Sequence, residues 1–318
     1  MMKRRDFIEK AGIAGSTGAL GTVLHPYFAG AQKKSDPKRI LNLKGEYYRH
    51  YPVDFSRDNE GALGFKSWGQ SIEIAVPADE TALLPMHIWN IGLSKELPFT
   101  SQGPAGGVMD MLEWASRSAP IIRTEIPTVL SATRTAKIPI IHIASSESYA
   151  AKYPGYKKSV KIAGTEPRGL SKAPEHNEYP SDSLKNELIF GKRFADSIDY
   201  YSKHIDFPEQ AKPLDSEYVV TTTHQLTEVL RNLGVWNLIY IGFAINWCLW
   251  FSPGGMSDMS RLGYRCNCIR EAVTAVENKE STHGEFNKQQ ALWRTSLMFG
   301  FIHSKEDYLF ACRKVYTG

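Results

Sequence analysis

Apolar and polar positions follow two different rhythms from residue 81 to the end of the chain. Short runs of apolar and β-branched residues predict strands at 81–90, 138–146, 216–223, 235–244 and 263–271. Between these runs, apolar residues recur every three or four positions and predict helices at 118–137, 224–234, 246–262 and 285–300. Strands that alternate with amphipathic helices favour right-handed βαβ units and a mostly parallel sheet with helices on both faces. The expected fold is therefore α/β, a three-layer α/β/α sandwich of the Rossmann-like kind.

Two segments do not follow this rhythm. Residues 32–80 are polar and broken by turn signals, with one alternating stretch at 71–76, and they predict an irregular N-terminal arm with a hairpin or an edge strand. Residues 147–212 are dense in Gly, Pro, Lys and Tyr and too long for an ordinary connection within the single domain expected at 81–318. This insertion leaves the carboxyl end of a predicted strand, where loops of open α/β sheets form the ligand crevice. It is either a cover over a substrate or a surface loop without function.

The first 31 residues have the layout of an export signal. Basic residues at 3–5 precede a weakly apolar run rich in Gly and Ala, and residues 29–31 provide an A-x-A cleavage site. The pair Arg4-Arg5 in "RRDFI" resembles the twin-arginine signal, which exports proteins already folded. We therefore expect a signal peptide at 1–31 that is read by the export machinery, and a mature chain that is periplasmic or otherwise extracytoplasmic.

Composition and charge narrow the classes of partner. Charged residues make up 23% and hydrophobic residues 42% of the 318 residues, which are ordinary values for a globular protein. The formal net charge of +4 is small and not clustered, so it gives no footprint for nucleic acid. No run reaches the ~18 apolar residues that a membrane span needs. The expected partner is a small molecule, as substrate or as ligand.

One of the four cysteines has an informative position. Cys248 follows the strand predicted at 235–244 and stands where the next helix should begin. At such a place the unpaired backbone N–H groups and the helix dipole stabilise a thiolate and can receive an oxyanion. Cys266, Cys268 and Cys312 are expected to be packing residues, because so large a domain needs no disulfide and the spacings carry no metal signature. Whether any disulfide forms stays open.

Other side chains should meet Cys248, because the carboxyl ends of parallel strands converge at one edge of a sheet. They are His87, Trp89 and Asn90 after the first strand, Ser145 and Ser146 after the second, Thr222 to His224 after the third, and Asn246 and Trp247 after the fourth.

The cysteine turn resembles that of a known family. The order Gly-Phe-Ala-x-Asn-x-Cys at 242–248, followed by "RLGYRCNCIREAV", is similar to the isochorismatase-like cysteine hydrolases, where a G-V-A-T-N-x-C turn precedes G-Y-x-V-x-V-x-x-D-A. Ile245 stands where Thr is usual, while Gly263, Tyr264, Glu271 and Ala272 follow the second pattern. "TALLPMHIWN" at 81–90 looks like the family's T-A-L-L-V-I-D-M-Q-N strand. The likeness spans residues 80–302.

This resemblance implies both a fold and a chemistry. The fold is a six-stranded parallel sheet flanked by helices, often in dimers or tetramers, so a homo-oligomer is expected. The chemistry is hydrolysis of an amide-type C–N bond by a triad of Asp, Lys and Cys, with Cys248 as the nucleophile. The resemblance also implies a cis peptide between Phe243 and Ala244 and an oxyanion hole of the backbone N–H groups of Ala244 and Cys248.

Two of the three triad positions depart from the family pattern. The Asp position falls on His87 and the Lys position on Thr222. A histidine can still accept a thiol proton, since its unperturbed pKa near 6.5 lies below the value of about 8.5 for Cys. We therefore predict a Cys248–His87 dyad. Asn90 or His224 would be its orienting group, and Trp89 and Trp247 would be walls of the pocket.

Two alternatives stay open beside the hydrolase. The first is a non-catalytic extracytoplasmic binding or accessory protein that retains the fold; the missing Lys and the Asp-to-His exchange favour it. The second is a metal site formed by His87, His142 and His224, although His142 lies mid-strand, where a core histidine is commoner. A cofactor-dependent oxidoreductase is not favoured, because no G-x-G-x-x-G follows a strand. We expect no cofactor and no metal.

Overall fold

The computed structural model describes residues 39–50, 56, 64–69, 71–167, 169 and 187–317, which belong to one unit of the chain, Lys38–Gly318. The predicted signal peptide at 1–31 lies outside the described residues, as do parts of the arm at 32–80 and of the insertion at 147–212. No helix in these described ranges combines the length and the apolar character needed to cross a bilayer.

The central sheet has six strands in the order β10-β9-β8-β5-β6-β7. They are Thr81–Met86 (β5), Ile141–Ile143 (β6), Tyr218–Val220 (β7), Asn237–Phe243 (β8), Arg265–Thr274 (β9) and Ile302–His303 (β10). Every neighbouring pair is parallel. Every residue of β5 and β8 is buried, as continuous apolar runs in a sheet covered on both faces require. The predicted six-stranded parallel sheet is confirmed.

The order of the strands places a topological switch point at one edge of the sheet. The chain runs outward from β5 through β6 to β7, then crosses to the other side of β5 and runs from β8 through β9 to β10. The direction of winding therefore reverses between β5 and β8. Connections that leave the carboxyl ends of these two strands diverge, and ligands of open α/β sheets bind at such a point.

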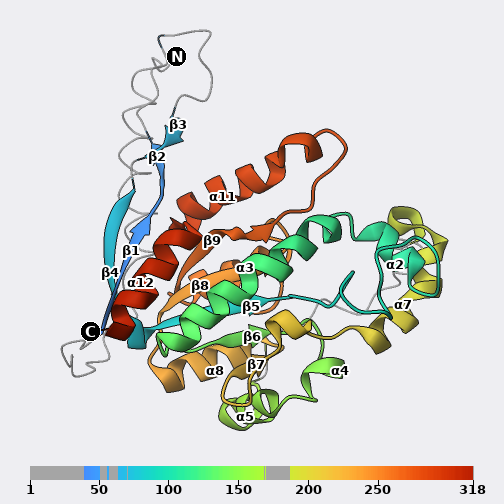
Figure 1. Cartoon of the computed structure of the whole chain (residues 1–318), viewed down its shortest axis with the longest axis horizontal. Coiled ribbons are helices and arrows are strands. Elements are labelled where there is room, and N and C mark those ends of the chain that lie inside the picture. The colour runs from blue at the N-terminus through green and yellow to red at the C-terminus, as the bar shows by residue number, and fades with distance from the viewer. Residues whose placement is uncertain are drawn as a thin grey trace, which may run out of the picture. The chain divides into compact units, whose positions relative to one another are not determined.

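Helices cover both faces of the sheet. Ala115–Thr135 (α3) and Lys305–Thr317 (α12) share one hydrophobic core with Leu83 of β5. The other core includes Leu84 of β5 and the helices Thr223–Leu233 (α8), Cys248–Phe251 (α9), Met256–Arg261 (α10) and Phe286–Met298 (α11). Figure 1 shows α3 and α12 lying across one face of the strands. The three-layer arrangement follows from the alternation of strand and helix patterns in the sequence.

The single helix predicted at 246–262 is wrong. The segment forms two short helices, α9 and α10, separated by residues 252–255. Pro253 lacks an N–H, and Gly254 has φ of 76°, a left-handed conformation that favours glycine. Cys248 therefore begins a helix of a single turn and not a long one.

The N-terminal arm contributes two small antiparallel sheets. One pairs Ile40–Gly45 (β1) with Ile72–Pro77 (β4), and the other pairs Tyr48–His50 (β2) with Phe65–Trp68 (β3). Glu46 forms an antiparallel bridge with Ile302 of β10, through hydrogen bonds of 2.7 and 3.1 Å. The arm thus pairs with part of an edge strand that would otherwise expose its backbone.

The remaining elements are short connections and the insertion. They are Ala78–Glu80 (η1), Gly106–Met111 (α2), Glu147–Ala150 (α4), Pro154–Ala163 (α5), Lys192–His204 (α7), Glu209–Ala211 (η2) and Thr282–Gly284 (η3). The helices α4, α5 and α7 lie within the predicted insertion, which therefore contains regular structure.

Candidate active site

The turn that carries Cys248 is fixed by backbone geometry and by one asparagine. Gly242 has φ of 119°, and a Cβ there would overlap the Met86 carbonyl oxygen, so only glycine fits. The following peptide bond, between Phe243 and Ala244, is cis, the isomer that the resemblance implies. Asn246 Nδ2 donates to the Val276 carbonyl at 2.9 Å, and Val276 N–H donates back to Asn246 Oδ1 at 2.9 Å. Asn246 therefore holds the turn against the end of β9.

The thiol of Cys248 is half-buried at the start of α9. Burial raises its pKa, and hydrogen bonds from the Ser252 side chain and the Ala244 N–H act against that increase without cancelling it. The expected stabilisation of a thiolate by a helix N-terminus does not prevail, because a four-residue helix has only a small dipole. The resting thiol is therefore protonated at neutral pH.

His87 lies directly beside this turn. It follows Met86, which pairs with Gly242 in the register of β5 and β8, and its N–H donates to the Ile143 carbonyl at 3.0 Å. Its φ of 50° is unusual for a residue other than glycine, and such conformations cluster at functional sites. The side chain is 5% exposed, and burial lowers its pKa to about 4.

The two predicted dyad residues follow adjacent strands, β5 and β8, and burial shifts the pKa of each toward its neutral form. His87 Nδ1 is buried and makes no hydrogen bond with any residue in the described ranges. Cys248 receives its hydrogen bonds from Ser252 and Ala244, and none from His87 among the described residues. The resting site therefore holds a neutral imidazole and a neutral thiol, and not a preformed ion pair.

A series of aromatic contacts begins at His87. The His87 ring stacks on Trp89 at 5.4 Å between centroids, and Trp89 packs on Trp114 at 5.6 Å. Trp114 stacks on Phe243 at 5.8 Å, and the edge of Trp89 meets Tyr201 at 6.5 Å. Trp247, expected as a pocket wall, is 49% exposed and lies at the surface.

Sequence reasoning missed Tyr201 as a site residue. It belongs to α7, far along the chain from both strands, and burial together with nearby Tyr149 and Cys248 raises its pKa. The only signal in the sequence was the position of the 147–212 insertion after a strand end. That signal points to a segment and not to a residue.

Asn90 anchors the helix α7. Among the described residues, its side chain forms no hydrogen bond with the His87 imidazole. Its Nδ2 donates to the His204 carbonyl at 3.1 Å, and its Oδ1 accepts from the Asp206 N–H at 3.1 Å. Asn90 N–H also donates to the Asp206 carbonyl at 3.0 Å. Asp206 in turn accepts hydrogen bonds from Lys152 and Tyr153, both at 2.8 Å. The carboxyl end of α7 is thereby tied to the end of β5.

The other predicted site residues have structural partners. Thr222 caps α8 by accepting the Gln225 N–H at 3.1 Å, and His224 Nε2 contacts the Ala163 carbonyl at 3.0 Å. His142 Nε2 contacts Glu217 at 2.9 Å, next to the Arg134–Glu217 ion pair. The three histidines do not converge, and in the part of the chain that the structure describes no group of three His, Cys, Asp or Glu could hold a metal ion.

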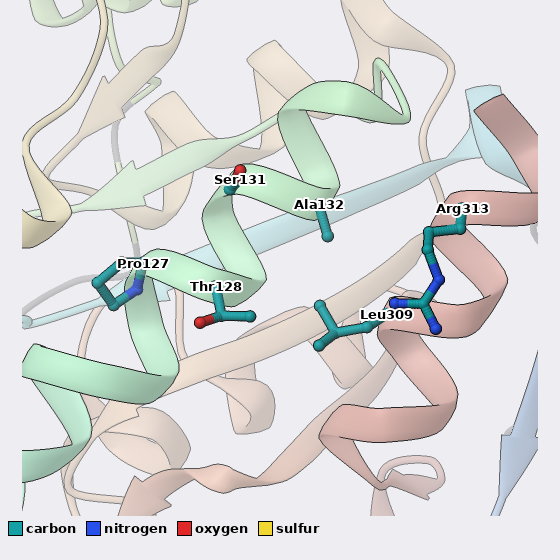
Figure 2. A pocket seen from close by; sticks show the side chains of 6 residues that line it. All are labelled: Pro127, Thr128, Ser131, Ala132, Leu309 and Arg313. Atoms are coloured by element: carbon teal, nitrogen blue, oxygen red, sulfur yellow. The ribbon is translucent and has the colours of Figure 1, made fainter.

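Three surface hollows are formed by other residues. Figure 2 shows one of about 460 Å³ between α3 and α12, lined by Pro127, Thr128, Ser131, Ala132, Leu309 and Arg313. A second, of about 350 Å³, includes Arg134 and Glu217, and a third, of about 290 Å³, includes Phe99 and Glu113. None of the three is lined by Cys248 or His87.

Comparisons with known proteins give similarity at the level of structure. No protein-family model and no curated protein sequence matches the chain. A cysteine hydrolase from Pseudomonas syringae pv. phaseolicola superposes with a TM-score of 0.45 and 14% identity, covering 76% of this chain and 96% of its own. An isochorismatase family protein from Burkholderia thailandensis has a TM-score of 0.39 and 17% identity, covering 74% and 96%. N-carbamoylsarcosine amidase from Thermoplasma acidophilum has a TM-score of 0.38 and 14% identity, covering 71% and 97%. At these values the activity has to be inferred from the residues of this chain.

Proposed function

We propose that this chain is a hydrolase that cleaves an amide-type C–N bond of a small molecule, with Cys248 as nucleophile and His87 as base. The observation that carries the proposal is the position of both side chains at the reversal point of the sheet. There, a buried imidazole nitrogen lacks a partner among the described residues, and the turn after the adjacent strand carries a half-buried thiol. The similarity of residues 242–248 to the isochorismatase-like cysteine turn supports the same reaction.

The first half of the reaction forms a thioester. Cys248 Sγ attacks the carbonyl carbon of the substrate while its proton passes to His87, which is unprotonated at neutral pH. The C–N bond then breaks, and His87 returns the proton to the departing nitrogen, which leaves as ammonia or an amine. In the second half, water attacks the thioester carbonyl, His87 takes a proton from that water, and the Cys248 thiol and a carboxylic acid are released.

The negative charge on the carbonyl oxygen needs hydrogen-bond donors. The Ala244 N–H is directed at the Cys248 sulfur in the resting site. No backbone carbonyl in the described ranges accepts the Cys248 N–H, since Leu249 takes the Ala244 carbonyl. Both N–H groups can therefore turn to an oxyanion, as the resemblance implies.

The raised pKa of Cys248 favours a second candidate function. A thiol that stays protonated, in a site without the family's Lys and Asp, suits a binding or accessory protein that holds a small molecule without reacting with it. In either case we propose that the chain works outside the cytoplasm, on the basis of the export signal expected at 1–31.

The test compares Cys248→Ser with Cys312→Ser, because Cys312 is buried in the core away from the site. Release of ammonia or amine from a panel of small carboxamides and N-carbamoyl compounds is measured at pH 7 to 9. Loss of release in Cys248→Ser with retention in Cys312→Ser supports the hydrolase. Equal activity in both variants overturns the role of Cys248, and no release from any compound favours the binding protein.

A further inference from the structure

The second of the three hollows lies at the amino ends of β6 and β7. Its lining residues 138–140 precede β6, and Leu214 and Ser216 precede β7. Cys248 and His87 instead follow the carboxyl ends of β8 and β5, and all these strands are parallel. A ligand in this hollow, of about 350 Å³, would therefore occupy a site at the opposite edge of the sheet from the proposed nucleophile.

Apolar residues form much of the lining of this hollow. They are Ile138, Pro139, Ile140, Leu214 and Leu233, and the ring of Tyr218 joins them. A hollow of this volume can hold a small molecule. Because burial of apolar surface is favourable, the lining favours a ligand with an apolar body.

Three cationic residues line the same hollow, against one carboxylate. Arg134 belongs to the last turn of α3 and Lys137 follows that helix, while Lys158 belongs to α5. Glu217 is the one acidic residue in the lining, and it pairs with Arg134. Neither lysine forms an ion pair with a carboxylate of the described ranges. The hollow therefore keeps an excess of positive charge that a bound anion would balance.

The buried carboxylate of Glu217 fixes the guanidinium of Arg134. Arg134 Nε donates to Glu217 Oε1 at 2.7 Å, and Nη2 donates to Oε2 at 3.1 Å. Burial acts to raise the pKa of Glu217, but hydrogen bonds with His142 and Arg134 outweigh it and lower that pKa to about 2. Arg134 Nη1 makes no hydrogen bond with a described residue. The guanidinium is thus held in one orientation with donors left for a ligand, and an ordered group loses little freedom on binding.

The two lysines are also positioned by their surroundings. Lys158 Nζ lies 3.9 Å from the centroid of the Tyr218 ring, a contact that orders the ammonium group and leaves its charge in place. Lys137 has φ of 54°, and its N–H donates to the Arg134 carbonyl at 3.0 Å. Glycine is the usual residue where a helix ends in this conformation, so a lysine accepts backbone strain there. Cations from two separate helices therefore line one hollow.

We propose that this hollow is a binding site for an organic carboxylate, whose anionic group lies against Arg134, Lys137 and Lys158 and whose apolar body lies against the apolar lining. The carboxylate would accept hydrogen bonds from Arg134 Nη1 and from the ammonium groups. An uncharged ligand would leave the cations unbalanced, and an anion without an apolar body would leave the lining in water. The site is independent of the reaction proposed at Cys248, and its test needs no turnover.

The experiment measures binding to the full chain by calorimetry at pH 7. The probes are hexanoate, the uncharged hexanamide, and acetate, which has the same anionic group and almost no apolar body. We expect hexanoate to bind at least about tenfold more tightly than either of the others. Equal or tighter binding of hexanamide overturns the cationic site, and equal or tighter binding of acetate overturns the apolar part. No binding of hexanoate at millimolar concentration overturns the proposal as a whole.

Substitution of the lysines places the binding in this hollow. Both lysines are exposed, so Lys137→Gln and Lys158→Gln should fold, and each should weaken hexanoate about fivefold. The matched control is Lys157→Gln, an exposed neighbour on α5 that does not line the hollow and loses the same charge. The control should bind hexanoate as the parent does. Equal affinity in all three variants would show that hexanoate binds elsewhere, at Cys248 for example, and would overturn the assignment, as would an equal loss in all three.

Discussion

At the scale of single residues, burial decides the chemistry of the candidate site. It lowers the pKa of His87 and raises that of Cys248, so the two shifts move both groups toward their neutral forms. A cysteine with these neighbours is not a reactive thiolate at rest. In the proposed reaction the proton moves only when the carbonyl is in place, and alkylation of resting Cys248 should be slow at pH 7 and faster as the pH approaches the raised pKa.

The first prediction concerns His87 and stability at acidic pH. Its pKa is lowered from 6.5 to about 4 in the folded protein, so the unfolded chain binds the proton first as the pH falls. The free energy of unfolding should therefore decrease between pH 6.5 and 4, by about 3 kcal/mol from this group. In His87→Gln that part of the decrease should vanish, as measured by urea unfolding at pH 7 and pH 4.

A control separates this effect from the general acid sensitivity of the fold. His283 is exposed, so its replacement removes no buried imidazole, and His283→Gln should keep the full decrease. His142 and His303 are buried with lowered pKa values, so some decrease remains in every variant. The prediction fails when the His87→Gln and parent proteins lose the same free energy between the two pH values.

At the scale of elements, α7 packs on the core only through partly buried side chains, which are Phe194, Ile198, Tyr200 and Tyr201, and polar contacts fix its two ends. Ser197 is the one residue of this helix that is buried, and its hydroxyl accepts the Gly107 N–H of α2 at 2.9 Å. Arg193 of α7 forms an ion pair with Asp110 of α2, at 3.1 Å. Asn90 holds the opposite end. Elements with few buried apolar side chains open locally at a low free-energy cost.

The second prediction is that Asn90→Ala releases α7 without unfolding the sheet. The change removes two side-chain hydrogen bonds, to His204 and Asp206, each worth about 1 kcal/mol. Amide hydrogen exchange over Lys192–His204 should accelerate about tenfold or more, while β5 and β8 keep their protection. In a protein with measurable hydrolysis, KM should rise more than kcat falls.

Lys203→Ala provides the matched control for this helix. Lys203 pairs with exposed Asp199 on the same helix, at 2.6 Å, and exposed pairs contribute little. Unchanged exchange in Lys203→Ala beside faster exchange in Asn90→Ala supports the anchor. Equal exchange in Asn90→Ala and the parent protein contradicts it.

The same elements show what sequence patterns can and cannot predict. The strands β5 and β8 and the helices α3 and α8 are local patterns, and they were predicted from periodicity and from the glycine that ends α8. Pro253 and Gly254 are signals for the break between α9 and α10. The helical spacing of the apolar residues around them nevertheless led to the prediction of a single helix. Tyr201 could not be predicted, because its place beside Trp89 and Cys248 depends on long-range contacts that α7 makes with α2 and Asn90.

At the scale of the whole molecule, two hydrophobic cores, one on each face of the sheet, hold the described part of the chain together. All four cysteines are free, and Cys266, Cys268 and Cys312 are buried as the sequence indicated. A chain of this kind can fold in a reducing compartment before transport, which is what export in the folded state requires.

The last prediction concerns where the molecule works. Arg4 and Arg5 should be required together, because an Arg presents a planar guanidinium with five donors, and Lys cannot reproduce that pattern for a receptor. Replacing both by Lys keeps the charge, so any effect belongs to recognition and not to charge.

In a bacterium with twin-arginine transport, the parent chain should appear outside the cytoplasm, shortened after Ala31, while the double variant stays inside at full length. Lys33→Arg with Lys34→Arg, beyond the cleavage site, should be exported normally. Export of the double variant at the parent level would contradict recognition of the arginine pair. Retention of the parent chain in the cytoplasm would contradict an extracytoplasmic role and confine the hydrolysis to the cell interior.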